Sequence, residues 1–127
     1  VYLMRKIRQR KYQREIIHIK LAENIVDINV NEVMYLQSDK NYVTAYDEDE
    51  QPLIRFRGLL KNIYTELADY GFIYIHKRYI INCRFINKFE NRKVVLSNNK
   101  EIASTRNAEV MSEAKRLYGE FMRKERW

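Results

Sequence analysis

The sequence predicts a mainly β fold of about eight to ten short strands paired in antiparallel sheets, with one short internal helix and terminal helices. Three observations support this prediction. Strand-sized runs of β-branched and aromatic residues recur from residue 16 onward. Short polar turns separate these runs and leave no room for the crossover helices of a doubly wound nucleotide-binding or receiver domain. Helical periodicity is confined to one short internal segment and to the chain ends.

The first five strands are expected at residues 16–20, 24–30, 33–37, 42–46 and 53–56. The fourth run alternates most clearly, with Val43 and Ala45 opposing tyrosine and threonine. Four consecutive acidic residues, 47–50, then precede Pro52. These carboxylates cannot all face one metal ion, so we interpret the run as a solvated hairpin tip.

A short helix is predicted after Gly58, because four apolar residues follow at helical spacing: Leu60, Ile63, Tyr64 and Leu67. Gly71 is expected to end this helix. Strands are expected again at residues 72–75, 79–82, 85–89, 93–96 and 101–103. From about Asn107 the periodicity becomes helical once more and predicts a terminal amphipathic helix, with an apolar stripe of Val110, Ala114, Leu117 and Phe121.

The composition indicates one folded domain. The chain has 127 residues, of which 46% are hydrophobic and 13% aromatic, too many for a disordered segment. Its single cysteine, Cys83, cannot form an internal disulfide, which favours a reducing compartment and a cytoplasmic location. No apolar run approaches the length of a membrane span. The chain begins with Val1 rather than methionine, so we interpret it as a fragment of a longer protein.

Charge is distributed unevenly along the sequence. Residues 1–14 hold six basic and no acidic groups. Residues 15–75 hold five basic and eleven acidic groups, whereas residues 76–106 hold eight basic and two acidic groups. Such asymmetry is typical of a surface that binds a polyanion, although scattering of the charges in the folded chain is an equal alternative.

The sequence shows no pattern typical of an enzyme or a cofactor site. Its three glycines form no phosphate-binding loop. The candidate metal ligands His18, His76 and Cys83 lack zinc-site spacing, so no metal is expected. A nucleophilic pair of Cys83 and His76 is conceivable, but a thiol in an apolar run is more often buried. We expect no catalytic activity and no cofactor.

Cations are interleaved with aromatic and small polar residues where strands end. Three such clusters occur: Lys40-Asn41-Tyr42, His76-Lys77-Arg78-Tyr79 and Ser104-Thr105-Arg106-Asn107. Arginine and asparagine present forked donors that fit base edges, and nearby hydroxyl groups can hold phosphates. Polar loops are common, so these clusters alone do not establish DNA binding.

The segment from Phe72 to Asn82, FIYIHKRYIIN, closely resembles the F-x-R-x-H-x-S-Y-I-V-N signature of the LytTR DNA-binding domain family. Three further stretches are similar to the family pattern, and the resemblance covers about residues 16–111. They are Val33–Gln37 with Asn41-Tyr42-Val43, Gly58-Leu59-Leu60 at the start of the helix, and Glu101–Arg106 in the closing strand and loop.

The resemblance implies an elongated stack of small antiparallel sheets and a bacterial transcription regulator, most often a two-component response regulator with a receiver domain upstream. It implies loops that enter successive major grooves of double-stranded DNA, commonly at direct repeats. It divides the chain into a basic linker or helix at 1–15, the LytTR-like domain at 16–106 and a helix at 107–127 packed on that domain. We expect the isolated domain to be a monomer that pairs on DNA.

The resemblance also assigns roles to individual residues. The expected base-reading residues are Arg106, Lys77, Asn41 and Tyr42. Residues expected to contact phosphate or to brace the loops are Lys40, His76, Arg78, Tyr79, Asn82, Ser104, Thr105 and Asn107. The chain departs from the family pattern where the strand before His76 lacks an arginine, where Arg78 replaces a serine, and at Ala103 and Thr105.

The residues alone are also compatible with two other classes of function. A β-rich protein-interaction or ligand-sensing module would bind no DNA. A single-strand binder would instead stack bases on Tyr42, Tyr79 and Phe85.

Overall fold

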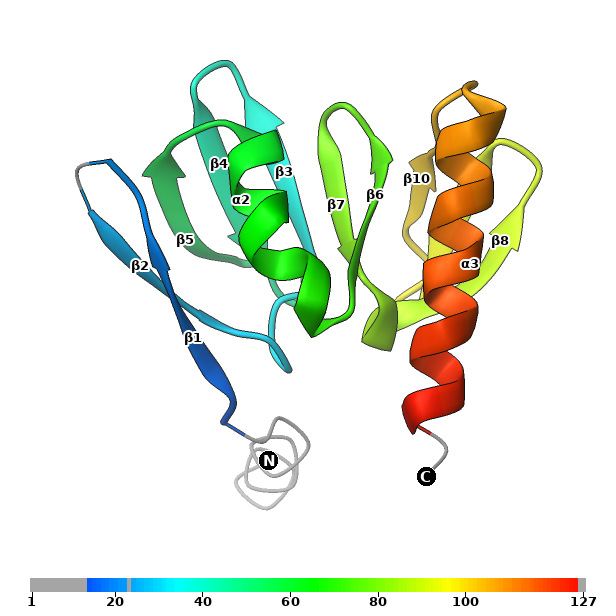
Figure 1. Cartoon of the computed structure of the whole chain (residues 1–127), viewed down its shortest axis with the longest axis horizontal. Helices are drawn as coiled ribbons and strands as arrows, with labels where there is room; N and C mark the ends of the chain where they lie inside the picture. The colour runs from blue at the N-terminus through cyan, green and yellow to red at the C-terminus, as the bar shows by residue number, and fades with distance from the viewer. Residues whose placement is uncertain (1–13, 23, 126–127) are drawn as a thin grey trace.

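The computed structural model describes residues 14–22 and 24–125. Within them, ten strands form three antiparallel sheets, and the prediction of a mainly β stack is confirmed (Figure 1). The expected N-terminal linker or helix falls largely on residues 1–13, which lie outside the described residues. The strands are β1 (Ile16–Lys20), β2 (Ile25–Asn29), β3 (Tyr35–Asp39), β4 (Tyr42–Tyr46), β5 (Pro52–Arg57), β6 (Phe72–His76), β7 (Tyr79–Asn82), β8 (Ile86–Glu90), β9 (Lys93–Leu96) and β10 (Glu101–Ala103).

A five-stranded sheet in the order β5-β4-β3-β7-β6 forms the centre of the molecule. The hairpin β1-β2 lies at one end, and a three-stranded sheet in the order β10-β9-β8 lies at the other. Most neighbouring strands are joined by tight turns, as in the β3–β4 hairpin, where Asp39 pairs with Tyr42. Lys40 in that turn has a φ of 58°, which a two-residue hairpin turn requires.

The first hydrophobic core lies between the five-stranded sheet, the β1-β2 hairpin and helix α2 (Leu60–Leu67). The predicted apolar stripe of α2 faces this core, with Leu60, Ile63 and Leu67 buried. A short 3-10 helix, η1 (Ala68–Tyr70), follows, and Gly71 ends it with a φ of 85°.

The second core lies between the other edge of the central sheet, the three-stranded sheet and helix α3 (Ala108–Glu125). Ala114 of α3 is buried, and Leu117 and Phe121 pack against the same cluster. Phe89 of β8 meets Tyr118 of α3 edge to face, with ring centroids 5.2 Å apart. Neither α2 nor α3 combines the length and the apolar content that a membrane crossing requires.

Several strand boundaries differ by one or two residues from the sequence prediction, and hydrogen bonds explain two of these differences. The third strand begins at Tyr35 rather than at residue 33, because Val33 and Met34 form a buried connection in which Met34 N donates to Tyr46 O. The eighth strand begins at Ile86, because residues 83–85 form a 3-10 turn, η2. The Asn82 side chain caps this turn by accepting a hydrogen bond from Arg84 N at 3.1 Å.

Candidate nucleic-acid interface

Turns from distant parts of the sequence lie together at one end of the strands, opposite the end where both described termini lie (Figure 1). Backbone hydrogen bonds join them. Gly58 N donates to Asn41 O at 2.8 Å, which ties the β3–β4 turn to the segment after β5. Ser38 N donates to Arg78 O at 2.9 Å, which ties the same region to the β6–β7 turn. The relative position of these segments is therefore fixed by the backbone.

The loop between β10 and α3 is held on both sides in the same way. Thr105 N donates to Ile75 O at 2.7 Å, and Ser104 N donates to Arg92 O at 3.1 Å. The first bond reaches the end of β6 and the second reaches the β8–β9 turn. We call the resulting surface the loop edge and define it as residues 40–41, 77–78, 91–92 and 104–107.

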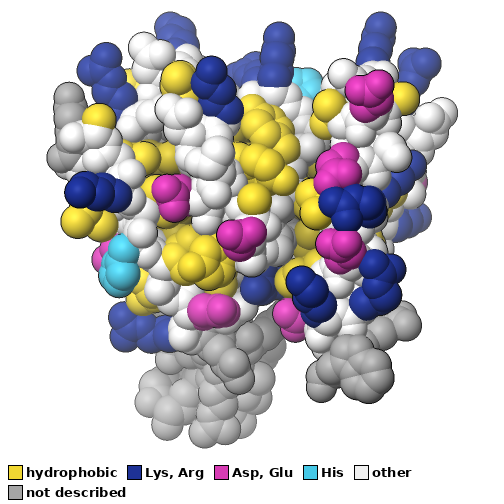
Figure 2. Space-filling view, in the orientation of Figure 1, with side chains coloured by type: hydrophobic (Ala, Val, Ile, Leu, Met, Phe, Trp, Pro, Cys, Tyr) yellow, Lys and Arg dark blue, Asp and Glu magenta, His cyan; other side chains and the backbone are white. Residues whose placement is uncertain are grey.

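The loop edge carries five cations and no acidic residue. All five are exposed, and none forms an ion pair with a described residue: Lys40, Lys77, Arg78, Arg92 and Arg106. Figure 2 shows Lys and Arg side chains projecting from this end; one acidic side chain lies just beneath them at the upper right, and the other Asp and Glu side chains lie lower on the same face. The acidic run 47–50 lies at the other end of β4, so its charge is separated from the loop edge.

The structure brings three of the four expected base-reading residues to this edge as exposed side chains, namely Asn41, Lys77 and Arg106. The fourth, Tyr42, is 41% exposed at the start of β4. The Arg55 guanidinium lies 4.6 Å from its ring centroid. One face of Tyr42 is thus already occupied by a cation, which leaves less of the ring for a base.

His76 lies at the end of β6 and supports the β6–β7 turn. Its Nδ1 accepts a hydrogen bond from Arg78 N at 3.2 Å, which places the proton of the neutral ring on Nε2. Burial lowers the pKa of His76, and the neighbouring Lys77 and Arg78 lower it further. Tyr74 donates its hydroxyl proton to Lys77 O at 3.1 Å from the other side of the turn. Lys77 is therefore presented from a turn that two side chains hold.

Two of the expected contact residues lie inside the fold. Asn82 is fully buried, and its Nδ2 donates to Val30 O and Val33 O, both at 2.7 Å. Tyr79 is half-buried, with its ring centroid 6.2 Å from that of Tyr35 and 5.8 Å from that of His76. These contacts place Asn82 away from any phosphate and give it a bracing position.

The third cluster holds the start of α3. Thr105 Oγ1 accepts a hydrogen bond from Asn107 N at 3.2 Å. Asn107 Oδ1 in turn accepts from Glu109 N at 2.9 Å and from Val110 N at 3.2 Å, which is the arrangement of a helix N-cap. Ser104 and Thr105 are half-buried, whereas the next residue, Arg106, is exposed. The loop that carries Arg106 is thereby anchored at both ends.

Arg92 is a member of the loop edge that sequence reasoning missed. It lies in the β8–β9 turn with a φ of 64°, and its carbonyl oxygen accepts the hydrogen bond from Ser104. The Asn91-Arg92 turn is visible in the sequence, but its proximity to Ser104 depends on the pairing of β9 with β10. The sequence feature that could have identified Arg92 is a cation at the tip of a predicted hairpin.

The described residues offer no ligand set for a metal ion, because no three of their His, Cys, Asp and Glu side chains come together. Cys83 is buried, and burial raises the pKa of its thiol to about 12. The thiol is therefore protonated at neutral pH and is not an activated nucleophile. The pair of Cys83 and His76 considered above has no support in this geometry.

The fold is that of a small β-rich domain, and the loop edge gives it a cationic surface of the kind that suits a polyanion. A profile of the LytTr DNA-binding domain family matches residues 23–115. The match spans well over half of the sequence, so the chain belongs to the LytTr DNA-binding domain family, which is a family of DNA-binding domains and not of enzymes.

Solved structures share this fold. One is the LytTr DNA-binding domain of a protein assigned as a methyl-accepting/DNA response regulator from Bacillus cereus. It superposes with a TM-score of 0.61 at 16% sequence identity, and the alignment covers 84% of this chain and 99% of that one. No curated protein sequence matches the chain.

Proposed function

We propose that the domain binds double-stranded DNA sequence-specifically by inserting the loop edge into the major groove. The observation that supports this proposal is the convergence of Asn41, Lys77 and Arg106, from three separate segments, on the loop edge, whose own residues include five cations and no acidic residue. Because hydrogen bonds already fix the backbone of these turns, binding has to order only their side chains and not the loops themselves.

Arg106 is the main base reader in this proposal, because a guanidinium can donate two hydrogen bonds to O6 and N7 of guanine. Lys77 and Asn41 read neighbouring bases from the adjacent turns. Lys40, Arg78 and Arg92 contact phosphates, which adds affinity without sequence preference. The N-terminus of α3 also faces this end, and its partial positive charge favours phosphate nearby (Figure 1).

The proposal is tested by comparing Arg106→Ala with Arg78→Ala in gel-shift titrations. The duplexes are one selected from a random library by the wild-type chain and one of scrambled sequence. Arg106→Ala should cost about 1 to 3 kcal/mol on the selected duplex and far less on the scrambled one. Arg78→Ala should weaken binding to both duplexes alike and flatten the salt dependence by about one unit of slope.

Lys115→Ala is the matched control, because Lys115 is exposed on α3 outside the loop edge. It should leave both affinities nearly unchanged. If Arg106→Ala weakens the two duplexes equally, Arg106 contacts only phosphate and the base-reading role is rejected. Competition with single-stranded DNA and RNA tests the alternative that the domain binds single strands. The proposed function requires that the domain prefer the duplex.

We further infer that the chain is the output domain of a cytoplasmic bacterial response regulator in a two-component system. Membership of the LytTr DNA-binding domain family supports this inference. Two copies would bind adjacent direct repeats. Sedimentation should show a monomer alone and two copies on a duplex with two sites, whereas a stable dimer without DNA would contradict the inference.

A further inference from the structure

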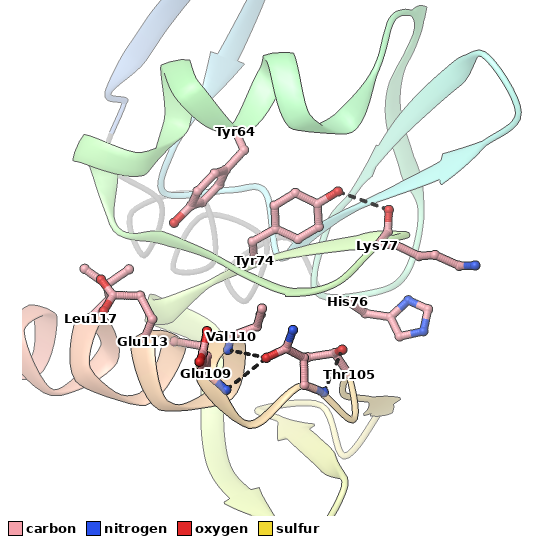
Figure 3. Close-up of a pocket in the computed structure, with 11 residues that line it drawn as sticks. Tyr64, Tyr74, His76, Lys77, Thr105, Glu109, Val110, Glu113 and Leu117 are labelled. Carbon is pink, nitrogen blue, oxygen red and sulfur yellow. Dashed lines mark hydrogen bonds between the residues drawn. The ribbon is translucent and has the colours of Figure 1, made fainter.

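A groove runs along α3 on the face of the molecule away from the three-stranded sheet. Its upper part is a cavity of about 560 Å³ between α2, β6 and α3, next to the loop edge (Figure 3). Its lower part is a cavity of about 320 Å³ between η1 and the second half of α3. Leu117 lines both cavities, so the two adjoin along α3, and we call them together the groove.

The floor of the upper cavity is mostly apolar. Val110, which is 38% exposed, and the half-buried Leu117 supply its α3 side. Tyr64 and Tyr74 supply the opposite side, with ring centroids 5.4 Å apart, and Figure 3 shows the two rings side by side between α2 and β6, with the Tyr74 hydroxyl directed to the Lys77 carbonyl oxygen. Figure 2 shows hydrophobic side chains exposed along the middle of this face. Exposed apolar surface of this kind is typical of an interaction site.

The rim of the groove is acidic. Six carboxylates line the two cavities, against Lys77, Arg84 and Lys124. Arg116 pairs with two of the six, Glu113 and Glu120. The other four form no ion pair with a described residue: Glu15, Asp69, Glu109 and Glu125. The groove therefore fits a basic segment with apolar side chains.

We propose that residues 1–14 of this chain bind in the groove. This segment contains six basic residues and no acidic residue, which complements the rim. It also contains Leu3 and Ile7, which can face an apolar floor together if the segment is helical. The segment ends where the groove begins, because Glu15 lines the lower cavity and its carbonyl oxygen accepts a hydrogen bond from Val30 N at 2.9 Å.

The segment is long enough to reach the upper cavity. Fourteen residues span about 20 Å as a helix and more when extended. The 18-residue α3 that forms one wall is about 27 Å long. A segment that starts at Glu15 can therefore follow most of that wall and approach Glu109. Its basic side chains would be placed beside the unpaired carboxylates.

Such binding would connect the start of the chain to the loop edge. His76 and Lys77 belong to the β6–β7 region of that edge and also line the upper cavity. Thr105 and Asn107, which hold the start of α3, line it as well. A segment bound there contacts two loops that the proposed DNA interaction uses. The binding itself does not depend on that DNA interaction.

Zero-length carbodiimide cross-linking of the full 127-residue chain tests the proposal. We expect Lys6 and Lys11 to cross-link to Asp69, Glu109 and Glu120. The acidic run 47–50 is an internal control. Its four carboxylates are closer together in the sequence than those of the groove, but they line neither cavity. Equal or greater cross-linking to residues 47–50 would overturn the proposal, because it would indicate a segment without a defined site.

A charge-reversal pair provides the matched comparison. The double variant Asp69→Lys, Glu109→Lys should lower the cross-links to the remaining groove carboxylates about fivefold, the loss expected for two exposed ion pairs. Asp27→Lys reverses a charge on β2, outside the groove, and should leave the cross-links to the groove carboxylates unchanged. Unchanged cross-links in the double variant would overturn the proposal.

Mixing isotope-labelled and unlabelled chains separates binding within one chain from exchange between two. If cross-links join only peptides of the same isotopic form, the segment binds within its own chain, and this result supports the proposal. A substantial share of mixed-isotope cross-links would overturn it in favour of a second copy as the source of the segment. DNA affinity is measured in parallel, so failure of the groove proposal and failure of DNA binding are observed separately.

Discussion

The buried side chain of Asn82 joins the β2–β3 connection to the start of η2, two segments that the sequence separates widely. Its Nδ2 donates to two carbonyl oxygens in the β2–β3 connection, and its Oδ1 accepts from Arg84 N and Arg84 Nη1, both at 3.1 Å. Every polar atom of this side chain is therefore used, although it is fully buried. The sequence indicated Asn82 as a motif residue, but only the fold shows that it braces the sheet that carries the loop edge.

Replacing Asn82 with alanine should destabilise the domain by about 2 to 4 kcal/mol, because two buried carbonyl oxygens would lose their donors. Urea unfolding measures the change. Asn87→Ala, at an exposed position on β8, should change the free energy of unfolding by less than about 0.5 kcal/mol. A similar loss in both variants would contradict the bracing role.

His76 provides a residue-scale prediction about pH. Its pKa is lowered in the free domain by burial and then by Lys77 and Arg78. Bound phosphates would favour the protonated ring and raise that pKa, so the complex would bind more protons than the free domain. DNA affinity should therefore increase as the pH falls through the higher pKa of His76 in the complex, and should level off below its lowered pKa in the free domain.

Fluorescence anisotropy with a labelled duplex at several pH values measures this effect. His76→Gln should remove a substantial part of the pH dependence. His18→Gln should retain it, because His18 lies on β1 and contacts Asp27 rather than the loop edge. Full retention of the pH dependence in His76→Gln would show that His76 is not near phosphate.

At the scale of elements, the contact of η1 with α3 is set by Gly71. A Cβ atom at this position would lie 2.6 Å from the Phe121 ring, and the φ of 85° disfavours any side chain. Gly71→Ala should therefore destabilise the domain by about 1 to 3 kcal/mol. Thermal and urea unfolding measure the change.

Gly119 is the matched control for this substitution. It lies within α3, and its added Cβ would meet nothing closer than Arg123 Nη1 at 3.8 Å. Gly119→Ala should stabilise the domain by about 0.5 to 1 kcal/mol, because alanine has the higher helix propensity. The free energy of unfolding should therefore fall in Gly71→Ala and rise in Gly119→Ala. Destabilisation by both substitutions would contradict the role given to Gly71.

Most elements could be predicted because local signals specify them. The alternation in residues 42–46 and the stripe from Leu60 to Leu67 each identify one element and its buried face. The start of β3 could not be predicted, since it depends on the pairing of Met34 with Tyr46. The start of β8 depends on the 3-10 turn that Asn82 caps. The first boundary is tertiary in origin, whereas the second is set by a local turn that the strand pattern does not reveal.

At the scale of the whole molecule, the charge asymmetry was visible in the sequence but its geometry was not. The basic stretch 76–106 contributes four of the five cations of the loop edge. Lys40 joins them because β3 pairs with β7, which places Ser38 beside Arg78. Arg92 joins them because β9 pairs with β10. Such long-range pairings could not be derived from local patterns, and neither could the groove along α3.

In the proposed function, four separate turns act together as one DNA-binding edge. Proton–nitrogen NMR of the full chain, titrated with the selected duplex, shows whether they bind as one surface. We predict that backbone amides at residues 40–41, 77–78, 91–92 and 104–107 shift together with one apparent affinity, while those at residues 47–50 and in β1 do not. Shifts concentrated in β1, or in only one of the four turns, would contradict the account.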